Sequence, residues 1–238
     1  MKPNGYVLYE GPSLLTGKPI VAIAVGLNQN SRNAKTGGMT QTYILCQDEN
    51  PIAAVNSGAD ASICGGCLHR KNPLTGVRTC YVRIDSAPNG VYKAWKRGVY
   101  PVLTDWAVFT GKAIRFGTYG DPAAVPLHVW QNLAAYAGTT TGYTHQWRAK
   151  KFAGLASFCQ ASAETADDVI RANAKGFGTF RVLPVMESVP SDSFHCPASA
   201  ERGKVATCLT CGVCDGFKGI NVTILAHGSS GHKYSGQR

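Results

Sequence analysis

The cysteines are the residues of this sequence whose spacing most clearly indicates chemistry. In the last quarter of the chain, eleven residues separate Cys196 from Cys208, and Cys211 and Cys214 follow at successive CxxC spacings. A CxxC turn brings two thiolates onto one centre, as in zinc knuckles and iron–sulfur sites. We therefore expect a structural metal site with these four ligands, holding zinc or an iron–sulfur cluster. Burial of the thiols without a metal is the alternative, and it is unfavourable for three thiols so close together.

A second set of cysteines lies in the first half of the chain. Cys64 and Cys67 are separated by two glycines, and Cys80 follows after twelve further residues. Three thiolates leave one coordination position open, as a reactive metal requires, so we expect this loop to hold the reactive centre. His69 as a fourth ligand would close the site and make it structural. Free structural cysteines are the third interpretation.

Two other side chains are candidates for catalysis. Asp121 follows a predicted strand in a Gly-Asp-Pro turn, where a carboxylate could act as a general base, nucleophile or ligand clamp, or could cap a helix. His145 lies in a second such loop, and Ser162-Ala163-Glu164 forms a third. We expect substrate contacts from the aromatic and basic side chains of these loops, which suit stacking of a base and binding of a phosphate: Tyr119, Tyr143, Trp147 and Arg148. A plain interface between sheet and helix is the alternative for the His145 segment.

Strands that alternate with helices would position these loops. Apolar periodicity predicts strands at 20–27, 42–46, 112–118, 155–160, 179–185 and 220–226, and helices at 126–137 and 166–175. Residues 47–90 have a loop-like composition, and Cys46 and Cys159 fall in strand-like runs and are interpreted as core residues. Thr165 is suited to cap the second helix and Gly176 to end it. Such alternation indicates parallel βαβ units, whose ligand sites lie at the carboxyl ends of the strands.

The predicted fold class is therefore α/β: parallel βαβ units in a complete or partial barrel-like arrangement, with a C-terminal cysteine-rich metal module. We place the α/β domain at residues 1–190, including the cysteine loop at 64–80. The metal module is placed at residues 191–238, with a closing strand and a flexible Gly/Ser/Lys tail from residue 227.

Composition limits the compartment and the partners. The 238 residues carry 24 Lys and Arg against 14 Asp and Glu, a formal charge of +10 that favours nucleotides or nucleic acid. The basic residues are scattered, however, so a generally basic surface explains them equally well. An export signal and an apolar run long enough to span a membrane are both lacking. Nine cysteines without an export signal indicate a reducing compartment, so we expect a protein of the (host) cytoplasm with no membrane partner.

Several segments together resemble a family of uncharacterised tailed-bacteriophage proteins over nearly the whole chain. They are the residues 11–45 that begin GPSLLTGKPI, ICGGCLHR with CYV, RFGTYGDPAAVP, GYTHQW, and CPAS followed by CLTCGVCDG. More distantly, the order of features is similar to radical S-adenosylmethionine barrel enzymes, with an early three-cysteine loop, a Gly-acid-Pro turn and a late ligated cluster. Those enzymes typically have CxxxCxxC, which differs from the spacing found here. A transglycosylase family that inserts deazaguanine into nucleic acid is also similar at Cys208, Cys211, Cys214 and His227, which would hold zinc.

These resemblances imply a phage-encoded metalloenzyme acting on a nucleotide or nucleic-acid substrate, for example in base modification through an iron–sulfur or zinc site, with S-adenosylmethionine as a candidate cofactor. The metal would lie in the loop of Cys64, Cys67 and Cys80, with Asp121 and His145 in contact with substrate. The competing interpretation is a non-catalytic, zinc-stabilised nucleic-acid-binding protein, in which both cysteine sets are structural.

Overall fold

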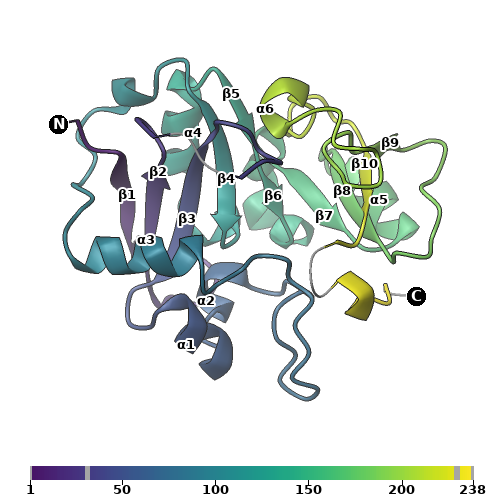
Figure 1. Cartoon of the computed structure of the whole chain (residues 1–238), viewed down its shortest axis with the longest axis horizontal. Coiled ribbons are helices and arrows are strands. Elements are labelled where there is room, and N and C mark those ends of the chain that lie inside the picture. Colours follow the sequence, from purple (N-terminus) through teal and green to yellow (C-terminus); the bar gives the residue numbers. More distant parts are fainter. Residues whose placement is uncertain (1, 30–32, 228–230, 237–238) are drawn as a thin grey trace.

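In the computed structural model, which describes residues 2–29, 33–227 and 231–236, the strands form two five-stranded sheets. The first has the order β1-β2-β3-β4-β5 and the second β6-β7-β8-β10-β9. Their bounds are β1 (Gly5–Pro12), β2 (Pro19–Val25), β3 (Thr40–Cys46), β4 (Ala113–Tyr119), β5 (Thr139–Thr141), β6 (Tyr143–Thr144), β7 (Gln160–Ala163), β8 (Thr179–Leu183), β9 (Phe194–His195) and β10 (Val222–Leu225). Only Gly142 separates β5 from β6, so the chain passes directly from one sheet into the other, and the strands succeed one another across Figure 1.

The parallel arrangement predicted from the sequence is confirmed from β3 onwards. Every strand pair from β3–β4 to β10–β9 is parallel, whereas β1, β2 and β3 pair antiparallel. The short connection from Pro12 to Pro19 explains the antiparallel pairing of β1 with β2, because a parallel crossover requires a dozen or more residues. The sheets remain open at β1 and β9, so the described chain forms no closed barrel.

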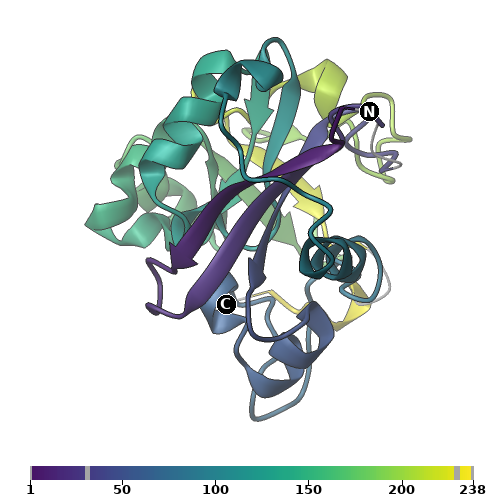
Figure 2. The same cartoon turned by 90° about the vertical axis from the view of Figure 1, so that its left-hand side faces the viewer.

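Helices cover both sides of the strands. Their bounds are α1 (Pro51–Ser57), α2 (Ala61–Cys64), α3 (Ala87–Lys96), α4 (Leu127–Tyr136), α5 (Ala166–Asn173) and α6 (Cys208–Cys211), with 3-10 turns at Trp106–Phe109, Pro122–Ala124, Gln146–Arg148, Lys150–Ser157 and Gly231–Lys233. In Figure 1, α3 lies in front of the strands and α4 and α5 lie behind them, which Figure 2 shows from the side. The core between these layers includes Trp130 of α4, whose ring centroid lies 5.0 Å from that of Phe116 of β4.

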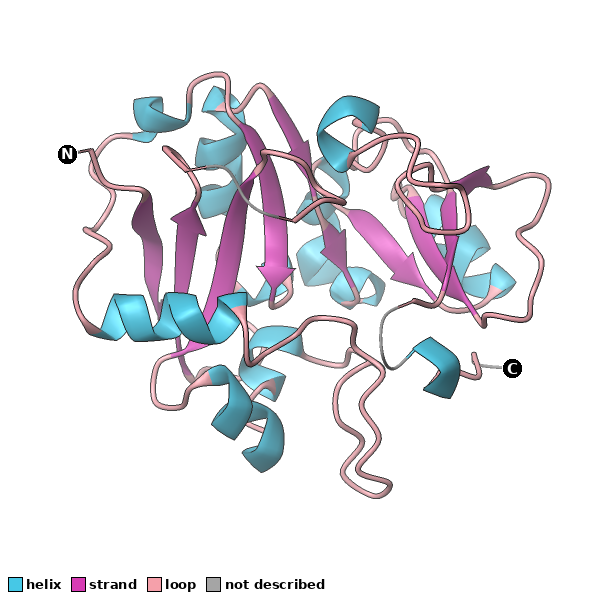
Figure 3. Cartoon of the chain, viewed as in Figure 1, coloured by secondary structure: helices cyan, strands magenta, loops and turns pink. Residues whose placement is uncertain are grey.

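Most predicted elements are present among the helices and strands that Figure 3 colours, and two of the predictions differ from the structure. Residues 155–160 do not form a strand: the 3-10 turn continues to Ser157 and β7 begins only at Gln160. A short apolar run does not distinguish a strand from a helical turn by its periodicity. The loop-like region 47–90 contains α1, which begins at an Asn50 cap and ends at Gly58. The predicted boundary signals of α5 are confirmed, because Thr165 accepts from the Asp168 amide and Gly176 has φ +82°.

The C-terminal segment shares the sheet of the preceding chain. Strand β10 lies between β8 and β9, so the predicted closing strand is confirmed near its expected place. Part of the tail expected to be flexible, 228–230 and 237–238, lies outside the described residues. The described part packs onto the fold, with Gly231 buried against Ala226. Among the described residues, none of the helices has the length and apolar character needed to cross a bilayer.

Gly120 lies where the chain after β4 approaches β3 closely, beside the cavity described below. It has φ +85°, and a Cβ there would lie 2.7 Å from Cβ of Ile44. Gly111 also has positive φ, but a Cβ there would meet nothing within 4 Å. We expect Gly111→Ala to lower the free energy of unfolding by about 1 kcal/mol through backbone strain alone. Gly120→Ala should cost about 3 kcal/mol because overpacking is added. Equal losses in urea titrations would contradict this packing.

Candidate metal-binding active site

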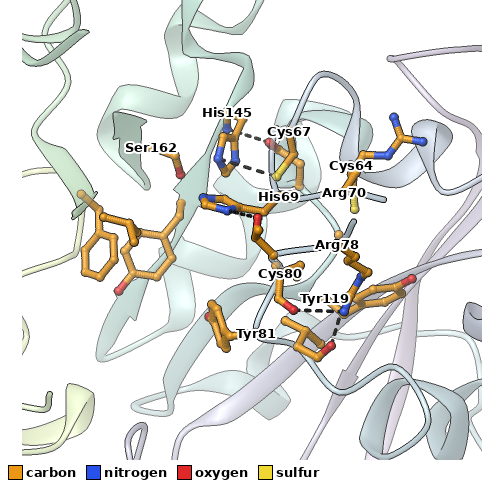
Figure 4. A pocket seen from close by; sticks show the side chains of 18 of the residues that line it. Cys64, Cys67, His69, Arg70, Arg78, Cys80, Tyr81, Tyr119, His145 and Ser162 are labelled. Atoms are coloured by element: carbon orange, nitrogen blue, oxygen red, sulfur yellow. Dashed lines mark hydrogen bonds between the residues drawn. The ribbon is translucent and has the colours of Figure 1, made fainter. Parts of the chain in front are cut away.

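A cavity of about 170 Å³ lies where the parallel strands end. Asp121 follows β4, His145 follows β6 and Glu164 follows β7, and all three line it. The cysteine loop after β3 forms the opposite wall with Cys64, Cys67 and Cys80 (Figure 4). The loops singled out in the sequence therefore meet in one place, as expected for the carboxyl ends of parallel strands.

The cysteine loop is held by its own backbone. The Cys67 amide donates to the Cys64 carbonyl over 3.2 Å, and the Cys80 amide donates to the His69 carbonyl over 2.9 Å. Burial raises the pKa of the Cys64 thiol, and the neighbouring Cys67 and Cys80 raise it further. Burial also raises the pKa of Cys80. A cation bound between these sulfurs would therefore have to displace thiol protons, which makes binding strongly pH-dependent.

His145 lies between Cys67 of the cysteine loop and Glu164, which follows β7. Its Nε2 lies 3.6 Å from Cys67 Sγ and 3.3 Å from a carboxylate oxygen of Glu164. Burial opposes protonation of His145, but Cys67 and Glu164 outweigh it and raise its pKa well above the usual value. A catalytic relay of the Cys-His-acid type would use two different ring nitrogens. Because both contacts fall on Nε2, the geometry instead indicates one shared proton or one shared cation.

His69 completes a group of candidate metal ligands. One ligand atom from each of His69, His145 and Glu164 lies within 4.8 Å of the other two. The Nδ1 atom of His69 is 2.9 Å from the Thr79 hydroxyl, a contact that fixes the ring and leaves Nε2 for a ligand. Burial, together with the proximity of His145, lowers the pKa of His69 to about 4, so this ring is neutral at pH 7 and can donate a lone pair.

Asp121 joins three segments at the cavity wall. Its carboxylate accepts from the Ala123 amide, the Thr144 hydroxyl and the His145 amide over 2.8 to 3.0 Å, and its own amide donates to the Ile63 carbonyl. Burial raises the pKa of this carboxyl, partly offset by those donors. The contacts are those of the capping alternative, and they position His145 and the cysteine loop. A catalytic role for Asp121 remains a prediction.

The four predicted substrate contacts divide into two pairs. Tyr119 and Tyr143 line the cavity. Trp147 is 1% exposed and donates to the Ser162 carbonyl, and Arg148 forms ion pairs with Glu164 and Asp168 while stacking 4.3 Å from the Trp147 ring. Neither of these two lines the cavity, because the 3-10 turn after β6 directs them toward α5. They form the interface that was the alternative interpretation.

Sequence reasoning did not select several residues of the cavity. Arg115, Lys35 and Tyr81 line it, and Arg115 is buried. One signal was present for Arg115, namely a charged residue inside the otherwise apolar strand AIRFGTY. Lys35 lies in a polar, Gly-containing turn after a predicted strand, where it could meet phosphate, and Tyr81 lies in the CYV segment, but neither was expected in this cavity.

The C-terminal cysteines come together at a second, smaller cavity. Its volume is about 20 Å³, and Cys196, Cys208, Cys211 and Cys214 all line it. That space suits one water-sized occupant, not a substrate. Burial raises the pKa of Cys214 to about 12, with contributions from the other three sulfurs. The four cysteines predicted from the CxxC spacing therefore share one small cavity, but among the described residues no three of their sulfurs lie within 4.8 Å of one another, so a metal site there stays a prediction. Tyr143 lines both cavities.

No protein-family model, curated protein or solved structure matches this chain.

Replacing Asp121 tests its positioning role. Asp121→Asn presents amide hydrogens to groups that already donate, so we expect the free energy of unfolding to fall by about 2 kcal/mol, the order measured for hydrogen bonds to charged groups. Asp85→Asn is the matched control, because Asp85 is exposed and forms an ion pair with the exposed Arg83. An Asp121→Asn variant as stable as the wild type in chemical denaturation would remove Asp121 from this role.

Proposed function

We propose that this chain is a metalloenzyme acting on a nucleotide or nucleic-acid substrate, with its reactive metal in the loop of Cys64, Cys67 and Cys80. One observation carries the proposal: three thiols from one loop line the cavity at the carboxyl ends of the parallel strands, beside His145. Perturbed titratable groups in a cavity at this position are the usual setting of an active site.

The placement of the three sulfurs is compatible with an iron–sulfur cluster, and the three thiols alone do not form a single-ion site. Ligand atoms on one tetrahedral zinc lie about 3.3 to 3.8 Å apart. Among the described residues, the trio of ligand atoms mutually within 4.8 Å belongs to His69, His145 and Glu164, and not to the three cysteines. Thiols that face one cavity without meeting at one point suit a cluster, whose core holds its ligands further apart.

The arrangement of segments supports the resemblance to radical S-adenosylmethionine enzymes. The cysteine loop follows β3, the first strand of the parallel region, and the Gly120-Asp121-Pro122 turn follows β4, its neighbour. S-adenosylmethionine is therefore the candidate second cofactor, and a bound cluster would supply one-electron chemistry. The residues of this chain would hold the cluster through sulfur, orient His145 through Asp121, and bind substrate beside Tyr119 and Tyr143.

A second candidate is a mononuclear metal enzyme. The 3.6 Å separation of Cys67 Sγ from His145 Nε2, and the 3.3 Å separation of that nitrogen from Glu164, match two edges of a tetrahedral zinc site. With His69 as an additional ligand, such an ion would activate water or polarise a substrate oxygen. The net charge of +10 also keeps a non-catalytic zinc-stabilised nucleic-acid-binding protein as a third candidate.

Metal analysis of anaerobically purified protein distinguishes the first two candidates. We expect iron, acid-labile sulfide and a broad visible absorption that Cys80→Ser removes and Glu164→Gln leaves in place. If zinc alone is bound, and Glu164→Gln lowers its content by one equivalent while Cys80→Ser does not, the mononuclear site replaces the cluster. Cys159→Ala is the control, because this buried cysteine lines neither cavity. Two bound zincs, salt-dependent DNA binding and no turnover would exclude both metalloenzyme candidates and support the non-catalytic nucleic-acid-binding protein.

The C-terminal site has its own test. Cys211→Ser should remove the metal bound by Cys196, Cys208, Cys211 and Cys214, and should lower the thermal midpoint because a structural metal contributes folding free energy. The same loss should follow chelation of the wild type. Unchanged metal content and melting in Cys211→Ser would show that these four cysteines hold no metal.

A further inference from the structure

The cavity contains a buried cation whose charge has no carboxylate partner. Arg115 is 5% exposed, and its side chain lines the cavity from the middle of the sheet. Among the residues that the structure describes, no Asp or Glu forms an ion pair with it. One Nη donates to the Tyr81 hydroxyl over 2.8 Å, and Nε has no hydrogen-bond partner. A buried charge without compensation is costly, so its presence requires an explanation.

The carboxylates of the cavity are already engaged elsewhere. Asp60 pairs with Arg70, Glu164 pairs with Arg148, and Asp121 accepts from backbone and hydroxyl donors. Lys35 adds positive charge on the same side of the cavity, because its Nζ lies 6.0 Å from the centroid of the Phe180 ring, which packs on the Tyr143 ring that Arg115 faces. A guanidinium with unused donors and a neighbouring ammonium form the kind of site that binds a phosphate.

Aromatic rings surround this cationic end of the cavity. The Arg115 guanidinium carbon lies 5.4 Å from the centroid of the Tyr143 ring, which packs 4.6 Å from that of Phe180. On the other side, Tyr81 stacks on His227 with 5.3 Å between ring centroids. Four rings beside a cation can hold a flat base while the guanidinium binds its phosphate.

We propose that Arg115 binds the phosphate of a nucleoside phosphate whose base lies among Tyr81, Tyr143 and Phe180. This deepens the proposed function and rests on it, since it names the substrate class of the same cavity. The cysteine thiols and the His69, His145 and Glu164 group line the same cavity as Arg115 and Lys35, so a substrate held by its phosphate would lie in the cavity of the candidate metal.

A competing role for Arg115 comes from the C-terminal cysteines. Cys208 as a thiolate lies close enough to contribute to the raised pKa of Arg115, which burial opposes and Tyr81 and Tyr143 also raise. A metal bound by four thiolates is anionic, and Arg115 could serve to neutralise it. The two roles predict different results for removal of the guanidinium, because only the second makes the C-terminal metal depend on Arg115.

The test measures binding of the four deoxynucleoside 5′-monophosphates and of the matching nucleosides by calorimetry, without turnover. In the wild type we expect at least one monophosphate to bind roughly 10- to 100-fold more tightly than its nucleoside, as a charge-assisted contact predicts. Arg115→Met should reduce this ratio to about 1, with metal content unchanged and a thermal midpoint at least as high as in the wild type. Arg115→Lys should retain part of the ratio. Arg83→Met is the control, because Arg83 is an exposed arginine with a side chain 78% accessible to solvent.

A wild-type ratio near 1, or a ratio that survives Arg115→Met, would overturn the phosphate site. Loss of the C-terminal metal in Arg115→Met with an unchanged ratio would assign Arg115 to the thiolate centre instead. The readout is binding, so the two proposals can fail separately. If the protein has no metal at the cysteine loop but still binds a monophosphate more tightly than its nucleoside, the proposed function is overturned and this inference stands. If the metal is bound but the two affinities are equal, only this inference is overturned.

Discussion

The hydrogen bonds of Asp121 are the interaction on which the arrangement of the cavity depends. Its carboxylate binds donors from the turn after β4 and from the end of β6, while its amide binds the carbonyl of Ile63 immediately before Cys64. One buried residue thereby connects two strands of different sheets with the cysteine loop. A buried carboxylate is tolerated here because several donors replace its hydration. These bonds help to fix His145 relative to the cysteine loop, together with the bond that the Gln146 side-chain amide donates to the Cys64 carbonyl.

The two sheets meet at a single residue. Strands β4 and β5 end the first sheet, and β6 to β10 form the second sheet after Gly142. A Cβ at Gly142 would lie 2.7 Å from Cys159 Sγ, so the chain crosses between the sheets where there is no space for a side chain. The close crossing places Tyr143 between the two cysteine-lined cavities, where its ring contributes to both walls.

Charge is distributed unevenly along the main cavity. Acidic and metal-ligating groups gather at the strand ends, where Glu164 and Asp60 are paired with arginines. Arg115 lines the same cavity, and among the described residues it contacts the Tyr81 hydroxyl and the Tyr143 ring but no carboxylate. Stability alone would favour an apolar residue at that position, since a buried guanidinium loses hydration that a hydroxyl replaces only in part. Such an imbalance is what a binding site for an anion requires.

The sequence alone determined the features that depend on near neighbours. The CxxC turns, the Thr165 cap with Gly176, and the strands β2, β3, β4, β8 and β10 follow from local spacing and periodicity, whereas the short strands β5, β6 and β9 were not predicted. The tertiary structure decided which distant loops meet. Glu164 and His69 join His145, Arg115 faces the cavity, and Trp147 and Arg148 turn away from it. Spacing along a chain specifies a residue's face on its own element, but contacts between elements depend on strand order and register, which the sheets fix only when they assemble.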